Sequence, residues 1–122
     1  MVEEKEAEKE CIFCKIARGE VPKEKFLYEN DNFVAFPDAN PKVEGHTLVI
    51  PKKHYVNLID MPETMASEMM DAIKKVFELR SKEGAEGFNV VSNVGPAAGQ
   101  LVMHAHIHVL PRKKQDSWKM GV

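Results

Sequence analysis

The stretch MHAHIHVLP, from Met103 to Pro111, carries three of the protein's five histidines within five residues. The histidines alternate with small or apolar residues, and this alternation predicts a strand over Gln100 to Leu110. Successive side chains of a strand point to opposite faces, so His104, His106 and His108 would share one face at spacings of about 6.5–7 Å. The other face is apolar and would pack inward; it carries Ala105, Ile107 and Val109.

A row of imidazoles on one sheet face has three readings. It could be the polar outer face of an amphipathic strand, although such faces ordinarily use Thr, Lys and Glu. Histidine titrates near neutral pH and ligates metals. The row therefore favours either a metal site or a site in which one imidazole is a nucleophile or base that its neighbours orient.

The bulk properties exclude several classes of protein. The chain has 122 residues, enough for one domain with one core, and its formal net charge of -2 provides no broad cationic surface for nucleic acid. No apolar run approaches the length needed to cross a membrane. Residues Met1 to Glu10 form a charged arm without the apolar centre of a signal peptide, so we expect a cytoplasmic protein with one domain over residues 11–122.

The rest of the chain predicts an α+β fold with an antiparallel sheet, because neighbouring strands are joined by turns and one long helix makes the crossover. The expected sheet has five strands, namely Phe26–Glu29, Phe33–Phe36, His46–Pro51, Gly87–Asn93 and the histidine strand. A short helix is expected over Cys11–Ala17 and the long one over Glu63–Lys82. Apolar residues of the long helix recur at three- and four-residue steps, typical of a core face; they are Met65, Met69, Ala72, Ile73, Val76 and Phe77.

The loop from Asn93 to Gln100 precedes the histidines and contains two glycines. It is either an ordinary turn or a loop whose backbone N–H groups and side-chain amides approach an anion. An anion held there would lie over the imidazole row. His106, in the middle, would then attack phosphorus from one nitrogen while its other nitrogen donates to a backbone carbonyl. His108 would donate to a phosphate oxygen or to the leaving group.

The two cysteines form the pair Cys11-Ile12-Phe13-Cys14. In a reducing compartment this spacing fits a redox couple, two metal ligands or two buried apolar thiols. Two cysteines supply only half of the ligands of a zinc site, so the pair alone does not distinguish between these three possibilities.

Residues His104 to Leu110 resemble the His-φ-His-φ-His-φ-φ motif, with φ hydrophobic, of the histidine triad (HIT) family of nucleotide hydrolases and transferases. The flanking Ala98–Gln100 and Pro111–Arg112 are also similar to the family, as are Gly45–His54 and Cys11–Ile16. The resemblance implies the HIT fold and a homodimer with the two sheets joined.

The resemblance also implies roles for individual residues. His106 would be the nucleophile and His108 would assist it. The implied nucleotide-binding residues are Gln100 at the phosphate, Asn93 and Gly99 in the glycine-containing loop, Asp38 at the ribose hydroxyls, and an apolar purine pocket of Ile12, Phe13, Ile16 and Phe36. From the sequence alone these four apolar residues fit a plain core equally well. Leu101 departs from the family, which often has Ser or Thr there to donate to the departing atom.

A subgroup of the family with Cys-x-x-Cys binds one structural zinc ion, and the resemblance carries its ligands onto Cys11, Cys14, His54 and His104. Two thiolates and two imidazoles suit tetrahedral Zn²⁺. The alternative is a pair of buried thiols without metal. His46 has no zinc ligand role in this scheme, and is either a polar group behind the triad or a strand-edge histidine.

The expected function is hydrolysis of a purine nucleotide whose α-phosphate bears an amine, a nucleoside polyphosphate or an acyl group. His106 would form a nucleotidyl-histidine, and water would release the nucleoside monophosphate. One alternative is a non-catalytic purine nucleotide-binding module. Another is a metallohydrolase whose triad holds a catalytic metal, but no acidic residue lies beside the triad to act as a base.

Overall fold

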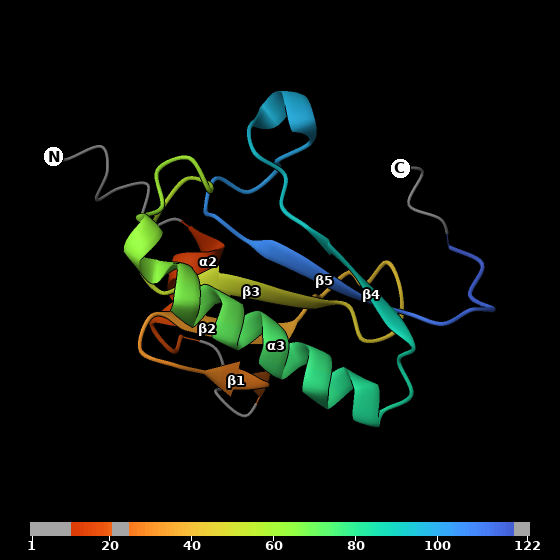
Figure 1. The fold of residues 1–122 in the computed structure, drawn as a ribbon. Helices are drawn as coiled ribbons and strands as arrows, with labels where there is room; N and C mark the ends of the chain where they lie inside the picture. Colours follow the sequence, from red (N-terminus) through yellow and green to blue (C-terminus); the bar gives the residue numbers. More distant parts are fainter. Residues whose placement is uncertain (1–10, 21–24, 119–122) are drawn as a thin grey trace, which may run out of the picture.

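The computed structural model of the protein describes residues 11–20 and 25–118. The charged arm expected over residues 1–10 lies outside the described residues. The chain order is α2 (Ile12–Ala17), β1 (Tyr28–Glu29), β2 (Phe33–Pro37), β3 (Thr47–Pro51), the 3-10 turn η2 (Glu63–Met65), α3 (Ala66–Lys82), β4 (Gly87–Val91), the 3-10 turn η3 (Pro96–Ala98) and β5 (Ile107–Arg112). Figure 1 shows these elements along the chain.

The strands form one five-stranded sheet in the order β1-β2-β3-β5-β4. Every neighbouring pair is antiparallel, and β3 pairs with both β2 and β5. The long helix α3 crosses the sheet (Figure 1) and provides the connection from β3 to β4. The predicted α+β fold with an antiparallel sheet, one long helix and one short helix is therefore confirmed.

The face of the sheet under α3 holds the larger part of the core. Ala72, Ile73 and Val76 of the helix are buried, as the apolar spacing predicted. They pack with residues that alternate along the strands, namely Phe33, Ala35, Val49, Ile107 and Val109. Met69 and Phe77 contact the edge of the same cluster. The inward side of the histidine strand is thus the surface on which α3 packs.

The opposite face carries a smaller apolar cluster under α2. Phe13 packs there with Val34, Phe36, Leu48 and Ile50, which alternate with the residues that face α3. Phe13 also contacts the imidazole rings of His104 and His106, with centroid distances of 5.8 and 5.1 Å. The histidine row therefore continues this cluster and lies on the α2 side of the sheet.

The histidine strand begins later than its alternation predicted. β5 starts at Ile107, so only His108 of the triad lies within it. Before that point the Ala105 N–H donates to Tyr55 O, and the Ser92 hydroxyl donates to His106 O. These contacts replace ladder bonds to β4, which ends at Val91. His104 and His106 therefore lie in an irregular segment, with bends at residues 102–104, that leads into β5.

Other element boundaries also differ from the predictions. β5 continues through Pro111 to Arg112, because its pairing with β3 ends at Val109 and Pro111 lies beyond it. The long helix begins with a 3-10 turn after Pro62 and becomes α-helical at Ala66. The loop before the histidines contains a short 3-10 turn. Within the described residues, we find no helix with the length and apolar content that crossing a bilayer requires.

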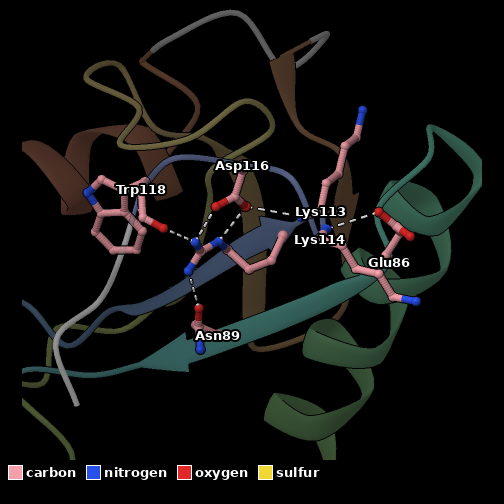
Figure 2. Close-up of polar contacts among 7 residues, drawn as sticks. Glu86, Asn89, Lys113, Lys114, Asp116 and Trp118 are labelled. Atoms are coloured by element: carbon pink, nitrogen blue, oxygen red, sulfur yellow. Dashed lines mark hydrogen bonds and ion pairs between the residues drawn. The ribbon is translucent and has the colours of Figure 1, made fainter.

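The segment after β5 folds back against β4. The Arg112 guanidinium donates to both carboxylate oxygens of Asp116, to Asn89 Oδ1 at 2.7 Å and to Trp118 O. Figure 2 shows Asn89, Asp116 and Trp118 around this guanidinium, whose central carbon lies 5.0 Å from the centroid of the Trp118 ring. Arg112 therefore secures the end of the sheet that is remote from α2.

Candidate functional site

One end of the histidine row faces the two cysteines. His104 Nδ1 lies 3.3 Å from Cys11 Sγ and 3.4 Å from Cys14 Sγ. His54 Nδ1 lies 3.2 Å from Cys14 Sγ. The four ligand atoms are all within 4.8 Å of one another. The structure thus brings together the four residues that the resemblance assigned to a metal, from α2, from the segment after β3 and from the segment before β5.

Local structure explains how each ligand is presented. Cys11 is the N-cap of α2, and its Sγ accepts from the Cys14 N–H, so one helical turn puts both sulfurs on the same side. His104 is fully buried, and its Nε2 donates to Pro51 O at 2.9 Å. This bond leaves the lone pair on Nδ1, which faces the thiols. Burial lowers the pKa of His104 to about 4, so the ring is held in its neutral, ligating form.

The cluster fits zinc by the chemistry of its donors. Zinc bonds of about 2.3 Å to sulfur and about 2.0–2.1 Å to nitrogen give tetrahedral sulfur–nitrogen edges of about 3.5 Å. The observed sulfur–nitrogen separations of 3.2, 3.3 and 3.4 Å are close to that edge. A closed set of two thiolates and two imidazoles is typical of a structural ion.

His106, the middle histidine, is oriented by a backbone carbonyl. Its Nδ1 donates to His104 O at 2.7 Å. In the neutral ring this places the proton on Nδ1 and the lone pair on Nε2, as predicted for a nucleophilic imidazole. The side chain is only 8% exposed and lies between the rings of Phe13 and His108.

His108 has the opposite tautomer, which is set by His46. The Lys42 N–H donates to His46 Nδ1 at 3.1 Å, so the proton of the neutral His46 ring is on Nε2. That nitrogen lies 2.9 Å from His108 Nδ1 and donates to it. The proton of His108 is then on its own Nε2. The ring centroids of His106 and His108 are 5.0 Å apart, so a ring with a free lone pair lies beside a ring with an N–H donor.

Burial keeps both of these supporting rings neutral. It lowers the pKa of His108 to about 4, and the neighbouring His106 and His46 contribute in the same direction. Burial also lowers the pKa of His46, while the carboxylate of Asp38 opposes the shift. Asp38 Oδ2 lies 3.3 Å from His46 Nε2, and its Oδ1 accepts from the Asn40 N–H. Asp38 is therefore in contact with the histidine pair.

The glycine-containing loop is held by the side chain of Gln100. Gln100 is buried, and both hydrogens of its Nε2 are used, by Val56 O at 2.6 Å and Val102 O at 3.0 Å. Its Oε1 accepts from the Gly95 N–H at 2.8 Å. In this structure Gln100 ties the loop to the segment after β3, and no Nε2 hydrogen is left for a phosphate.

The remaining loop residues stay at the surface. The Asn93 amide donates to Gly99 O at 3.2 Å, which closes the loop. Gly95 and Gly99 have φ angles of 91° and 87°, a backbone conformation that L side chains rarely adopt. Leu101, which follows the loop, is 90% exposed. The loop is therefore a preformed turn that presents backbone groups and an apolar side chain.

The four residues of the implied purine pocket separate into two groups. Phe13 and Phe36 are buried with their ring centroids 6.0 Å apart, and Ile16 packs against the same cluster. Ile12 is 50% exposed, because it lies on the outward side of α2. Phe13, Phe36 and Ile16 thus belong to one apolar cluster, in which Phe13 contacts His106, while Ile12 lies at the surface.

Comparison with known proteins shows the family of the chain. The HIT domain family model matches residues 18–115, which is most of the chain. The chain belongs to the HIT family. An uncharacterized HIT-like protein of Methanocaldococcus jannaschii is 46% identical over 106 residues, covering 87% of this chain and 81% of the relative.

Two further HIT relatives bear on the chemistry. The adenosine 5'-monophosphoramidase of Candida albicans is 39% identical over 118 residues, covering 92% of this chain and 76% of the relative. The crystal structure of a zinc-bound histidine triad family protein from Mycobacterium smegmatis superposes with a TM-score of 0.84 at 36% identity, covering 93% of this chain and 82% of that one. At the level of the family, the match therefore supports a nucleotide hydrolase.

Sequence reasoning left one site residue of this HIT domain unassigned. The sequence predicted that His46 is either a polar group behind the triad or a strand-edge histidine. Its contact with His108 shows that it is the polar group behind the triad. His46 comes immediately before a strand rich in β-branched residues, and this position in the sequence does not predict a contact with His108. The carbonyls of Pro51 and His104, which set two of the tautomers, carry no sequence signal, because every residue has a carbonyl.

Proposed function

We propose that this HIT protein hydrolyses purine nucleotides whose α-phosphate carries an amine, acyl or nucleotide leaving group, through a covalent nucleotidyl-histidine. The observation that carries the proposal is the pairing of tautomers in adjacent rings. The hydrogen bonds at the two Nδ1 atoms assign a lone pair to Nε2 of His106 and a proton to Nε2 of His108. A nucleophile beside a proton donor is what displacement at phosphorus requires.

The reaction has two balanced steps. In the first, His106 Nε2 forms a bond to the α-phosphorus and the bond to the leaving group breaks, while the Nε2–H of His108 donates a hydrogen bond to the leaving atom or to a phosphate oxygen. A leaving amine takes up a proton from water, whereas a carboxylate or phosphate departs without one. In the second, water attacks the same phosphorus and releases its proton to the solvent, the bond to His106 breaks, and the nucleoside monophosphate departs. Both rings end in their starting tautomers, so the site is ready for another turnover.

The surrounding residues have supporting roles in this proposal. Phe13 and Phe36 provide an apolar surface for the base, and Ile16 extends it. Asp38 accepts from the ribose hydroxyls, and Asn93 with Gly99 lies at the phosphate. Gln100 acts as a positioning residue, because its amide holds the loop through Val56 and Gly95.

We assign a structural zinc ion to Cys11, Cys14, His54 and His104. These residues would join α2 to the segment after β3 and to the segment before β5, and the bound ion would supply folding free energy. His104 is then both a ligand and, through its carbonyl, the acceptor that orients His106.

We also infer a cytoplasmic homodimer, as the family resemblance implies. β4 lies at an edge of the sheet, and its Val90 is 46% exposed, so an apolar strand edge is available to a second copy. Molar mass from light scattering after size exclusion tests the dimer, and a mass of one chain at micromolar concentration contradicts it.

A substrate panel tests the proposed hydrolysis. Adenosine and guanosine phosphoramidates, an acyl adenylate and dinucleoside polyphosphates are incubated with wild type and with His106→Ala, and nucleoside monophosphate is quantified. We expect turnover by wild type and none above background in the variant. Nucleotide binding without turnover by wild type would identify a binding module instead, and equal turnover by both proteins would exclude His106 as the nucleophile.

A further inference from the structure

Arg80 belongs to the face of the sheet opposite the histidine row. It lies near the C-terminal end of α3, and its side chain is only 11% exposed. Its Nε and Nη2 donate to Thr47 Oγ1 at 3.2 and 3.1 Å. Its Nη1 donates to Glu83 Oε1 at 2.7 Å. Two donors of a largely buried guanidinium are therefore committed to one hydroxyl.

Thr47 connects that contact to the other face of the sheet. It is fully buried, begins β3 and pairs with Val109, whose side chain packs under α3. Because side chains alternate along a strand, the preceding His46 points to the α2 face, where it meets His108. Arg80 thus holds the chain one residue away from a histidine of the site.

The same contact supports the turn that sets the tautomer of His46. The Thr47 hydroxyl donates to Gly45 O at 2.8 Å. Gly45 has a φ of 82°, and a Cβ built there would lie 3.4 Å from Arg80 Nε and 3.1 Å from Pro111 Cγ. The turn therefore packs directly on the guanidinium. In this turn the Lys42 N–H lies 3.1 Å from His46 Nδ1.

We propose that Arg80 is a positioning residue of this site, which acts across the sheet through Thr47 and the turn of residues 42–46. By holding the turn, it keeps the Lys42 N–H on His46 Nδ1, and so keeps the protons on Nε2 of both His46 and His108. If the turn shifts, His46 gains access to the tautomer with Nδ1–H. Its Nε2 then accepts from His108 Nδ1, and His108 presents a lone pair in place of a proton.

The ring tautomers are the direct test. Long-range ¹H–¹⁵N correlations of the histidine rings report which nitrogen is protonated in the zinc-loaded full chain. We expect the Nε2–H form to predominate at His46 and His108 in wild type. Arg80→Met and the isosteric Thr47→Val are expected to shift both rings toward Nδ1–H. Unchanged tautomers in either folded variant would overturn the proposal.

Two matched variants separate this role from general stabilisation. Glu83→Gln removes the ion pair of Arg80 and leaves the Thr47 contact, and Thr47→Ser keeps the hydroxyl. Both are expected to retain the wild-type tautomers, even where the melting temperature falls. If either of these controls shifted the rings as much as Arg80→Met, the hydroxyl contact would not be the cause. Thr47→Val decides the outcome if Arg80→Met does not fold.

The catalytic consequence rests on the proposed function, but the tautomer measurement does not. With a phosphoramidate, Arg80→Met is expected to lower kcat about tenfold or more with little change in KM, because His108 no longer offers an Nε2–H to the departing amine. If wild type turned over none of the substrates, the proposed function would be wrong. The role of Arg80 would then be tested by the tautomer measurement alone. Wild-type kcat in Arg80→Met with shifted tautomers would overturn the catalytic part.

Discussion

The two ends of the histidine row use the same side chain for different purposes. At one end His104 is immobilised, because its Nε2 donates to Pro51 O and its Nδ1 faces two thiols. At the other end His108 accepts from His46 and keeps an N–H directed at the site. His106 lies between them, and its hydrogen-bond partner among the described residues is a backbone carbonyl. The comparison teaches that the partner of one ring nitrogen decides what the other nitrogen can do.

The middle of the row is where a substitution has the largest expected effect. We expect His106→Ala to lower kcat by about 10⁴-fold or more, because the nucleophile is lost. Single-turnover assays with the best substrate measure the loss. Circular dichroism and zinc content serve as controls, and both should match wild type. Residual activity within about tenfold of wild type would mean that another group attacks phosphorus.

Loss of the metal ion is expected to lower the stability of the protein before it lowers the activity. We expect Cys14→Ser to lose the ion and to lower the melting temperature by about 10 °C or more, since a loss of about 1 kcal/mol shifts the midpoint of a domain by several degrees. Elemental analysis and differential scanning fluorimetry provide the two readouts. An equal drop in wild type with a chelator would confirm that the ion is responsible. Lost activity with unchanged stability would indicate a catalytic ion instead.

The donor end should respond in a way that depends on the leaving group. We expect His108→Asn to lower kcat by about 10²-fold for a phosphoramidate, because an amine is a poor leaving group and depends most on the hydrogen bond from His108 Nε2–H. For an acyl adenylate, whose carboxylate departs without a proton, the loss should be much smaller. Comparing both substrates on one variant removes differences in folding. Equal losses for the two substrates would argue against a proton donor at this position.

The smallest expected effect is on acid stability. The pKa of His108 falls from its ordinary 6.5 to about 4 on folding because of burial. The unfolded chain therefore binds the proton first, and stability is lost as the pH falls from 6.5 towards 4. His108→Asn, which cannot titrate, should show a shallower decrease of melting temperature over that window than wild type. Parallel curves for the two proteins would mean that His108 is not held neutral.

Local patterns in the sequence predicted the sheet and the helices, and the family resemblance implied the four metal ligands. The alternation at His104 to His108 and the apolar stripe of α3 are periodic signals, and Cys-x-x-Cys fits one helical turn. The sequence could not predict where β5 begins, since Ser92 and Tyr55 replace the ladder through contacts distant in sequence. The tautomers depend on carbonyls and on the Lys42 N–H, which have no residue-specific signature.

The hydrogen-bond partners of Gln100 could not be predicted from the sequence for the same reason. The sequence places an amide beside a glycine-containing loop, but its partners Val56 O and Gly95 N–H come from backbone groups that only the fold brings together. Ile12 and Ile16 look alike in sequence, and their different burial follows from the direction in which α2 faces the sheet.

The central claim is that His106 Nε2 bonds to phosphorus while His104 holds the metal. The most direct test is rapid acid-free quenching of wild type with a slowly hydrolysed adenosine substrate, followed by intact mass and peptide mapping. The account predicts a gain in mass equal to one adenylyl group, mapped to His106 and absent from His106→Ala. An adenylyl group mapped to His104, His108 or a lysine, or an adduct that persists in His106→Ala, would contradict it.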